Sequence, residues 1–488
     1  MKIVFKPFLL PVIYGTIVAL LLLMPVLLCV PTYAEEDEAE CWAVIVGVSD
    51  YAELYDLDYC DDDARELSQE LSLAWGEDHI NVLLNDMATK SNIEEAVLGW
   101  LASKEDVDDT VLLFFSGHAY EEILLPYDSL LTSYDNDIWA DDLNNWLNKL
   151  DSRKIVIIID GCLSGSFFGE ISRSGRVTMM AASPYEGAYE DPSLGHGVFS
   201  YYILEALHEW DFSDTNHDYE IAAEEIFYYA QPKVVSNTEA NPPIQHPMLS
   251  DNYAGQLDLL MKATFSSSCA MPSDATILTI DERICLGRDL PISFIWIPGS
   301  THNLNIPSLV PGGEGIRYIF TSWNDGNTLT SRTISQGGAY TADYEKQYYL
   351  TIKSDYGKPE GEDWYSSGSM ATISVTSPAG AIFRQVFIGW SGDYSGTTAS
   401  ASVIMDAPKT VVANWRTDYM QLYMIIGGGV VVGALIVVLM MRRRKKAVAP
   451  ARVERIIQPP ATKYCKNCGA EIELGDAFCI KCGEAVEE

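Results

Sequence analysis

The sequence predicts an α/β domain with a doubly wound, mostly parallel sheet, followed by all-β repeat modules, one transmembrane helix and a small cysteine-rich module. Three observations predict this order. Short apolar runs alternate with amphipathic helical stretches over 41–260. Short alternating runs rich in Ser, Thr, Gly and aromatic residues follow over 263–415. A charge-free apolar segment over 420–441 is long enough to cross a bilayer, and four cysteines lie within 463–486.

The α/β region shows strand-like and helix-like segments in alternation. Its first strand is expected at Trp42–Val48 and its second at Ile80–Leu84, with a helix at Asp61–Leu73 between them. The capping-box spacing of Ser91 and Glu94 predicts that a further helix begins there. The other elements expected here are strands at Val111–Ser116, Lys154–Asp160 and Val177–Ala182, and helices near Ala140–Leu150 and Val198–Glu209.

The chain is long and strongly acidic. At 488 residues it is too long to fold around one hydrophobic core, so several domains are expected. Its formal charge of −37 argues against nucleic acid as a partner. Four of the ten cysteines fall in the last two dozen residues, which predicts two redox compartments rather than one disulfide framework. Cys269 and Cys285 flank a strand-like run, and both a disulfide and two free thiols stay open for them.

The N-terminus carries a second apolar segment. Lys2 and Lys6 precede an apolar run over 8–30, and small residues ending at Ala34 come before an acidic stretch. This arrangement predicts a secretory signal peptide at 1–34, although the length of the run leaves an uncleaved anchor open.

The apolar segment near the other end predicts a single-pass membrane protein. Tyr419 and Tyr423 mark one boundary of the segment, and five basic residues, Arg442–Lys446, mark the other. Since basic residues accumulate on the cytoplasmic side, we expect residues before Tyr419 outside the cell membrane and the C-terminus in the cytoplasm. A linker over 447–461 leads to the cysteine-rich module.

Two of the predicted strands end beside residues that can perform nucleophilic chemistry. His118 comes two residues after the strand at 111–116, and Cys162 comes two residues after the strand at 154–160. Because ligands bind at the carboxyl ends of parallel strands, both side chains are expected at one edge of the sheet. A thiol beside an imidazole can attack an acyl group and form a thioester intermediate. The alternative is a buried cysteine and an unrelated histidine, which the placement of both at strand ends disfavours.

The region over 41–260 resembles the caspase-like cysteine peptidases of clan CD, family C14, and within them the metacaspase type. The resemblance rests on ordered motifs: WAVIVGVSDY, YCDDDA, FFSGH, a Pro126/Asp128 pair, DGCLSG, TMMAAS and GVF. It implies that Cys162 is the nucleophile and His118 its base or imidazolium partner. It also implies that the backbone N–H groups of Ala119 and Cys162 hold the oxyanion. The family usually has glycine at position 119, and alanine resists positive φ, which keeps open an inactive surface sensor or adhesin.

The resemblance further implies a substrate preference. Asp63 and Asp160 match the two aspartates that line the metacaspase pocket for the residue before the scissile bond, with Ser183 expected on the pocket wall. Two carboxylates in a narrow pocket favour Arg or Lys, so a membrane-anchored extracytoplasmic endopeptidase cutting polypeptides after basic residues is expected. Arg173 and Arg176 are then candidates for self-cleavage. The acidic turn also suits a helix start, and CLSGS also resembles the Asn-specific legumain branch, so both readings stay open.

An acidic loop has the spacing of a calcium-binding loop. Its predicted calcium ligands are Asp214, Asn216, Asp218, Glu220 and Glu225. The sixth loop position normally needs glycine and here is Tyr219, so a solvated acidic loop stays open as the alternative.

The cysteine-rich end has a specific metal signature. Cys465-x-x-Cys468 is followed after ten residues by Cys479-x-x-Cys482. Four thiolates at this spacing predict a closed, structural zinc site. The segment resembles the short zinc ribbons at the ends of microbial membrane proteins, which implies a docking module for a cytoplasmic protein.

The β-rich region contains a weak internal repeat. Ile319–Trp323 resembles Val386–Trp390, and each is followed by a related strand, Thr341–Tyr344 and Val412–Trp415. The region is similar to the internalin-type B-repeats of microbial surface proteins, which implies a stalk, spacer or adhesive module.

Overall fold

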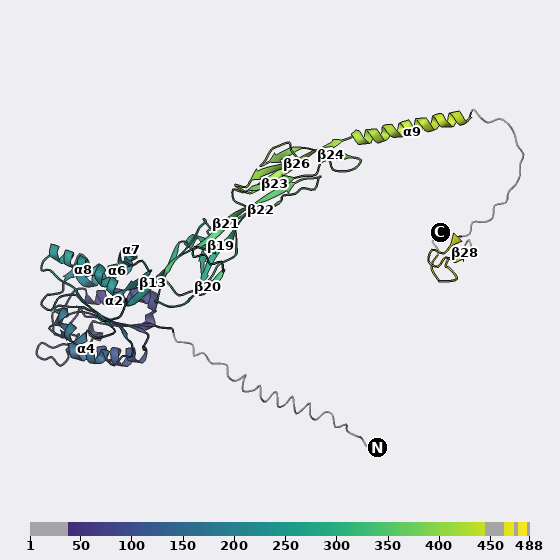
Figure 1. The fold of residues 1–488 in the computed structure, drawn as a ribbon. Coiled ribbons are helices and arrows are strands. Elements are labelled where there is room, and N and C mark those ends of the chain that lie inside the picture. The colour runs from purple at the N-terminus through teal and green to yellow at the C-terminus, as the bar shows by residue number, and fades with distance from the viewer. Residues whose placement is uncertain (1–37, 445–462, 473–476, 486–488) are drawn as a thin grey trace, which may run out of the picture.

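The computed structural model describes residues 38–444, 463–472 and 477–485. The predicted signal peptide at 1–34 and linker at 447–461 lie outside these described residues. Figure 1 shows an α/β domain, two β-rich modules and the helix α9 following one another along the molecule. The predicted order of α/β domain, β-rich sheets and apolar helix is therefore confirmed.

A six-stranded sheet forms the centre of the α/β domain. Its strand order is β12-β8-β7-β3-β1-β2, and every neighbouring pair is parallel except β12 with β8. β1 and β3 are buried at every residue, which explains their nearly continuous apolar sequences. The strand bounds are Cys41–Gly47 (β1), Ile80–Leu84 (β2), Thr110–Ser116 (β3), Lys154–Asp160 (β7), Arg176–Met180 (β8) and Met248–Asp251 (β12).

Helices cover both faces of this sheet (Figure 1). The core on one face contains residues of α2, α6 and α8, and the core on the other contains residues of α3 and α4. Alternate residues of β3 enter the two cores, with Phe114 in the first and Phe115 in the second. The helix bounds are Cys60–Trp75 (α2), Lys90–Glu95 (α3), Ala140–Leu147 (α4), Phe168–Ile171 (α5), Val198–His208 (α6), Trp210–Ser213 (α7) and Ala223–Ala240 (α8).

The start of α3 differs from the prediction. The helix begins at Lys90, and Thr89 is its N-cap, since the Thr89 hydroxyl accepts a backbone N–H of the first turn at 3.3 Å. The Asp128 carboxylate accepts from the Lys90 N–H at 2.9 Å. The expected capping box of Ser91 and Glu94 is wrong, because Ser91 already lies in the first turn and an acceptor 38 residues away satisfies the helix start.

One continuous sheet joins the α/β domain to the second β-rich module. β11 (Glu220–Ala222) precedes α8 in the domain and pairs with β13 (Asp258–Ser267). β13 pairs with the 16-residue strand β21 (Gly338–Lys353), which pairs in turn with β26 (Lys409–Asp418). The two modules have separate apolar cores, and β21 contributes to both. The domain boundary expected after residue 260 thus falls inside β13.

The two β-rich modules repeat one arrangement. In each, an antiparallel strand pair shifts register just before a buried tryptophan: β19 against β21 at Trp323, and β24 against β26 at Trp390. The tryptophan lies opposite an alanine in both strand pairs, Ala342 and Ala413. The likeness to internalin-type repeats stays a prediction. The other strands are Thr276–Ile280 (β14), Arg283–Leu286 (β15), Ile292–Trp296 (β16), His302–Asn305 (β17), Leu309–Pro311 (β18), Ile316–Trp323 (β19), Ser331–Ile334 (β20), Asp363–Ser366 (β22), Met370–Ser374 (β23), Arg384–Gly392 (β24) and Ser400–Ile404 (β25).

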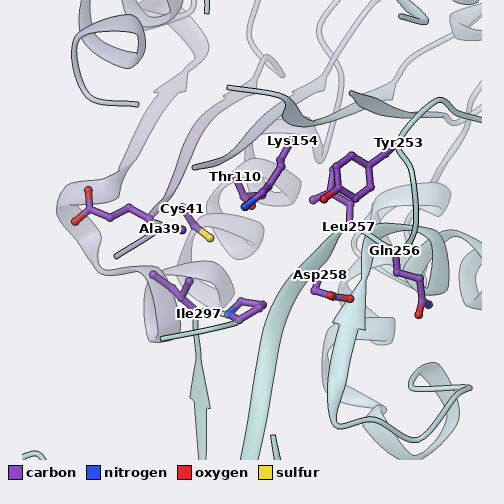
Figure 2. Close-up of a pocket in the computed structure, with 11 residues that line it drawn as sticks. Ala39, Cys41, Thr110, Lys154, Tyr253, Gln256, Leu257, Asp258 and Ile297 are labelled. Carbon is purple, nitrogen blue, oxygen red and sulfur yellow. The ribbon is translucent and has the colours of Figure 1, made fainter. Parts of the chain in front are cut away.

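A small cavity lies at the junction between the α/β domain and the first β-rich module (Figure 2). Cys41 and Lys154 line it from the amino ends of β1 and β7, and Asp258 and Ile297 line it from the module side. Burial and the neighbouring charge of Glu220 raise the pKa of Asp258 to about 7. Because these are the amino ends of the parallel strands, the cavity lies on the opposite edge of the sheet from His118 and Cys162.

Cys269 and Cys285 are free thiols in the structure. The Cys269 thiol donates to the Tyr344 carbonyl oxygen at 3.1 Å, and Cys285 is buried in the core of the first module. Of the two alternatives that the sequence leaves open, the structure has the unpaired thiols.

Helix α9 (Met420–Arg444) begins two residues after β26 ends. Within the described residues it is the one helix long and apolar enough to cross a membrane, and the most apolar 18 residues within Met420–Arg443 have a mean hydropathy of 2.7. None of its most apolar stretch is buried. At the C-terminal end, β27 (Lys463–Tyr464) and β28 (Glu471–Ile472) form a short antiparallel pair.

Candidate active site

His118 and Cys162 line the same cavity at the carboxyl ends of β3 and β7. The two strands are neighbours in register, with Ser116 opposite Asp160, so the turn after each strand begins at the same level. The structure therefore brings together the imidazole and the thiol that the sequence places after two different strands.

Two tyrosines position His118. The Tyr55 carbonyl oxygen lies 2.7 Å from Nε2 of His118, and since a carbonyl can only accept, Nε2 carries the proton. In the neutral imidazole this leaves Nδ1 as the basic nitrogen. The His118 backbone N–H donates to the Tyr51 hydroxyl oxygen at 2.7 Å, and the two rings lie 4.8 Å apart. Sequence reasoning missed both contacts, because neither a backbone carbonyl acceptor nor a backbone N–H donor leaves a signature in the sequence.

The turn after β7 presents the Cys162 thiol at the cavity. Leu163 has a left-handed φ of 58°, an uncommon conformation for a bulky residue, and its N–H donates to the Glu186 carbonyl oxygen at 2.8 Å. The Cys162 thiol itself donates to the Ala188 carbonyl oxygen at 3.7 Å. Within the described residues the thiol is therefore hydrogen-bonded to the backbone rather than to His118, as is common in free enzymes whose catalytic contacts tighten with substrate.

Ala119 meets no backbone strain. It opens the extended strand β4 (Ala119–Tyr120), so the positive φ that makes glycine necessary is not required there. Gly161 is the position where glycine is needed instead. A Cβ on Gly161 would lie 2.8 Å from the Ala119 Cβ and 2.9 Å from the Gly117 carbonyl oxygen. The same Cβ would lie 3.7 Å from the Ala119 amide nitrogen, which places that N–H beside the turn carrying Cys162.

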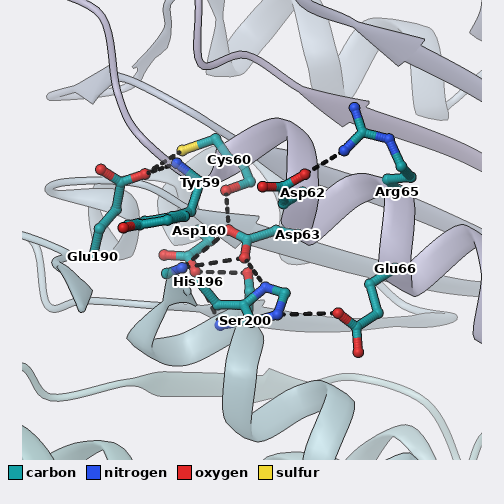
Figure 3. A network of polar contacts seen from close by, with 12 residues as sticks. Tyr59, Cys60, Asp62, Asp63, Arg65, Glu66, Asp160, Glu190, His196 and Ser200 are labelled. Atoms are coloured by element: carbon teal, nitrogen blue, oxygen red, sulfur yellow. Dashed lines mark hydrogen bonds and ion pairs between the residues drawn. The ribbon is translucent and has the colours of Figure 1, made fainter. Parts of the chain in front are cut away.

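The two predicted pocket aspartates, Asp63 and Asp160, lie close together in a network of polar contacts at the start of α6 (Figure 3). The Gly197 N–H donates to Asp63 at 3.1 Å, and the Ser200 N–H and hydroxyl donate to Asp160 at 3.0 and 2.7 Å. A Cβ on Gly197 would lie 2.7 Å from one Asp160 oxygen and 3.0 Å from one Asp63 oxygen, so both carboxylates flank this glycine. Asp160 lines the cavity, whereas Asp63 is fully buried behind it.

Burial of the two carboxylates shifts the pKa values of Asp160, Asp63 and their neighbour His196. Burial and the charge of Asp63 raise the pKa of Asp160 to about 7. Burial also raises the pKa of Asp63, which a hydrogen bond from His196 Nδ1 at 2.9 Å opposes. The other His196 nitrogen lies 3.0 Å from the Glu66 carboxylate, and the hydrogen bond to Asp63 raises the pKa of His196.

Asp160→Asn is expected to remove a pH-dependent loss of stability. The folded pKa of Asp160, about 7, lies above its usual value of 3.8, so the folded domain binds this proton more tightly than the unfolded chain. This contribution to stability is present below about pH 4 and is lost as the pH rises toward about 7. We expect the melting temperature of the wild type to fall by a few degrees relative to that of the Asn variant across this range. Parallel thermal unfolding tests this, and a constant difference would contradict it.

Further residues of the cavity were not predicted from the sequence. Cys60, Ser116 and Glu190 line it together with His118 and Cys162. Glu190 lies on β9 (Glu190–Asp191), which pairs with β10 (His196–Gly197). Its carboxylate accepts hydrogen bonds from the Tyr59 N–H at 2.6 Å and the Asp58 N–H at 3.0 Å. These are backbone donors just before α2, which would otherwise lack a partner in the helix. This contact joins segments about 130 residues apart, so no local pattern indicates it.

Three other predicted positions lie elsewhere. Ser183 lies in the loop after β8, where its N–H donates to the Glu186 carboxylate at 3.4 Å. It is not among the residues that line the cavity. Arg176 is 3% exposed and donates to the Asn144 side chain at 2.9 Å, so it is inaccessible to cleavage in the folded domain. Arg173 is half-buried and lies beside the amino end of β8, at the edge of the sheet away from Cys162. Self-cleavage at Arg176 is thus contradicted for the folded domain.

The predicted calcium loop uses its carboxylates internally. Asp214 accepts the N–H groups of Asp218 and Tyr219 at 3.2 and 3.0 Å, and Glu225 accepts the Thr215 N–H at 2.9 Å. Asn216 donates to Asp218 at 2.7 Å, and Glu220 shares a hydrogen bond with Asp258. Among the described residues, only the four C-terminal cysteines bring three or more ligand atoms within 4.8 Å of one another. The structure therefore gives no support for calcium at Asp214, Asn216, Asp218, Glu220 and Glu225.

The four C-terminal cysteines fit a structural zinc ion. Their sulfur atoms all lie within 4.8 Å of one another, and the Cys465–Cys482 and Cys468–Cys479 pairs are each 3.6 Å apart. Tetrahedral coordination with Zn–S bonds of about 2.3 Å requires sulfur separations of about 3.8 Å. A zinc ion held by these thiolates would cross-link the two knuckles and stabilise this small module.

Cys468→Ser is expected to abolish stoichiometric zinc binding by the full chain, because three thiolates leave the tetrahedral site open. Elemental analysis of the purified protein should find one zinc per chain in the wild type and far less in the variant. Cys269→Ser is the matched control and should retain its zinc. Equal zinc content in all three proteins would contradict the assignment.

Comparison with known proteins identifies two regions of the chain. A family model described as the caspase domain of peptidase family C14 matches residues 40–254, and a zinc-ribbon family model matches residues 464–486. The crystal structure of caspase-1 from Spodoptera frugiperda is similar over 46% of this chain and 90% of that chain, with 14% sequence identity and a TM-score of 0.35. No curated protein matches this chain. Residues 40–254 therefore form a caspase domain of the cysteine-type peptidase class, and residues 464–486 form a zinc ribbon.

Proposed function

We propose that this chain is a membrane-anchored, extracytoplasmic cysteine endopeptidase that cleaves polypeptides after Arg or Lys. The observation that carries the proposal is the acidic cavity beside the nucleophile. Asp160 and Glu190 line the cavity together with Cys162, and Asp63 lies directly behind Asp160. A basic side chain entering this cavity would form charge-assisted hydrogen bonds with carboxylates held in fixed positions.

In the proposed reaction, His118 Nδ1 takes the Cys162 thiol proton and the thiolate attacks the scissile carbonyl carbon. The N–H groups of Ala119 and Cys162 stabilise the resulting oxyanion. The tetrahedral intermediate collapses to a thioester, and His118 returns the proton to the leaving amine. A water molecule, deprotonated by His118, then hydrolyses the thioester and restores the thiol. The hydrogen bond to the Tyr55 carbonyl stabilises the imidazolium formed in both steps.

The charge of the cavity favours some substrates over others. An Asp side chain before the scissile bond would be repelled by Asp160 and Glu190, and an Asn side chain would gain no ionic contact. Arg has a planar fork of donors that can bind a carboxylate in two places, so we expect Arg to exceed Lys. Asp63 would act through Asp160, because its own oxygens already accept hydrogen bonds from Ser116, His196 and Gly197.

The membrane placement rests on α9 and the charges around it. α9 is apolar and unburied, and the basic residues Arg442–Lys446 follow its apolar stretch. Basic residues accumulate on the cytoplasmic side, which supports an external caspase domain and a cytoplasmic zinc ribbon. We propose that the ribbon is a docking module for a cytoplasmic protein, because a closed four-thiolate site has no position open for catalysis.

Cleavage of matched reporter peptides by the full chain in lipid nanodiscs tests the proposal. The peptides differ only in the residue before the scissile bond: Arg, Lys, Asn or Asp. We expect turnover in the order Arg, Lys and then, far below, Asn and Asp. Preference for Asn would indicate the legumain-like alternative and contradict the basic specificity.

A second candidate function is an inactive caspase-fold surface sensor or adhesin. The observation that favours it is the hydrogen bond from the Cys162 thiol to the Ala188 carbonyl in place of a contact with His118. If none of the four reporters is cleaved under reducing conditions by protein shown to be folded, the sensor or adhesin is the better description.

A further inference from the structure

The loop between β23 and β24 is attached to the first turn of α9. With its amide oriented to suit its neighbours, Gln421 donates to the Ala381 carbonyl oxygen at 2.7 Å and accepts from the Arg384 guanidinium at 3.2 Å. β24 and β26 also pair at their outer ends, Arg384 opposite Asp418, immediately before α9 begins. The loop tip Pro378–Phe383 is therefore held level with the start of the helix.

This tip is apolar and open to solvent. Its sequence, PAGAIF, has no charged or polar side chain. Ile382 is 50% exposed and Phe383 is 60% exposed, although neither packs into the core of the module. Tyr419 and Tyr423 are exposed on the adjoining end of α9. The adjacent exposed Ile and Phe side chains and the unburied apolar helix form one continuous apolar surface. A contiguous exposed apolar surface of this kind indicates an interaction site.

We propose that the loop tip Pro378–Phe383 inserts Ile382 and Phe383 into the outer leaflet of the lipid bilayer, beside the point where α9 enters it. The inference rests on the proposed membrane anchoring by α9. If α9 enters the bilayer near Met420, Gln421 holds the tip at the same depth, where aromatic residues prefer to lie. Moving the Ile and Phe side chains from water into the acyl boundary is favourable, because it removes their apolar surface from water.

The lipid bilayer is favoured as the occupant by continuity and charge. The tip adjoins the apolar surface of α9, and near it the two cations Arg384 and Arg416 outnumber the one carboxylate, Asp418, which lies opposite Arg384. A net positive charge at this end suits lipid phosphates. Two neighbouring points of attachment, the helix and the tip, would restrict the tilt of the β-rich modules relative to the membrane. A single helix alone leaves that tilt free.

Site-specific photocrosslinking in the full chain tests the inference. A benzophenone amino acid is placed singly at Phe383, at Val430 within α9, or at Ile404 in vesicles containing an alkyne-tagged phosphatidylcholine. Ile404 is the matched control, because it is 49% exposed in the same module but pairs with Met370 at the far end of β23. All three positions are exposed, so the substitutions leave the core intact.

We expect lipid adducts from positions 383 and 430 and at least tenfold fewer from position 404. Adducts at 430 without adducts at 383 would overturn the insertion while leaving the membrane anchoring in place. Adducts at neither position would overturn the anchoring and the insertion together. A crosslink from 383 to a second copy of the chain would show that the tip is a protein interface and would also overturn the proposal.

Discussion

Replacing Cys162 with alanine is expected to lower kcat/KM for the Arg reporter by at least about 10⁴-fold, because the variant lacks the sulfur atom proposed to form the thioester. The variant retains the backbone N–H of residue 162 and the cavity, so it should still bind the reporter. Binding can be measured by fluorescence polarisation and turnover by release of the leaving group. Cysteine-free hydrolysis through the remaining His118 would be too slow to approach the wild-type rate.

Cys269→Ala is the matched control for this experiment. Cys269 is also a free thiol, but it lies in the first β-rich module and hydrogen-bonds to Tyr344 rather than to any group of the cavity. It should keep full activity. Retention of more than one tenth of the wild-type activity by Cys162→Ala would exclude Cys162 as the nucleophile and direct attention to Cys60, the other thiol of the cavity.

Asp160→Asn is expected to lower kcat/KM for the Arg reporter by about 10- to 100-fold, the usual effect of losing one charge-assisted hydrogen bond. Asparagine has nearly the same shape, and its oxygen can still accept from the Ser200 N–H and hydroxyl. The change therefore removes the negative charge while retaining the contact that holds the start of α6. A reporter with norleucine in place of Arg has no cation and should lose little.

The ratio of the Arg rate to the norleucine rate is the informative quantity for Asp160→Asn. Ser200→Ala is the matched control, because it removes a hydrogen bond to Asp160 and leaves its charge. The control should change that ratio far less than Asp160→Asn does. Equal losses on both reporters in Asp160→Asn would assign Asp160 a structural role only.

The positions of His118 and Cys162 could be predicted because they depend on local signals. Each follows a buried apolar strand, and neighbouring parallel strands end at the same edge of the sheet. The contacts that orient them could not. The Tyr55 carbonyl is a backbone atom, and Glu190 reaches the start of α2 across about 130 residues. Neither contact depends on a short motif, so only the folded chain reveals it.

The calcium loop and Arg176 are the opposite case: a sequence pattern is present, but the structure does not support the function expected from it. Spacing alone gives the residue types at 214–225, but it cannot say that Asp214 and Glu225 accept backbone N–H groups of their own loop. Likewise Arg176 follows a small loop in the sequence, yet it begins β8 and is hydrogen-bonded in the core. Hydrogen bonds within the loop decided the first outcome and burial decided the second, and neither is visible in a local sequence pattern.

The sheet that runs from β11 through β21 to β26 also bears on which substrates are within reach. At about 3.3 Å per residue, the 16 residues of β21 alone span about 50 Å. If α9 anchors the chain and the loop tip limits its tilt, as proposed, a spacer of this kind would hold the cavity at a nearly constant height above the bilayer, unlike a flexible linker, whose end explores a wide volume. Proteins fixed in the same membrane with a scissile bond at that height would meet the peptidase at a high effective concentration, whereas bonds close to the bilayer would escape it.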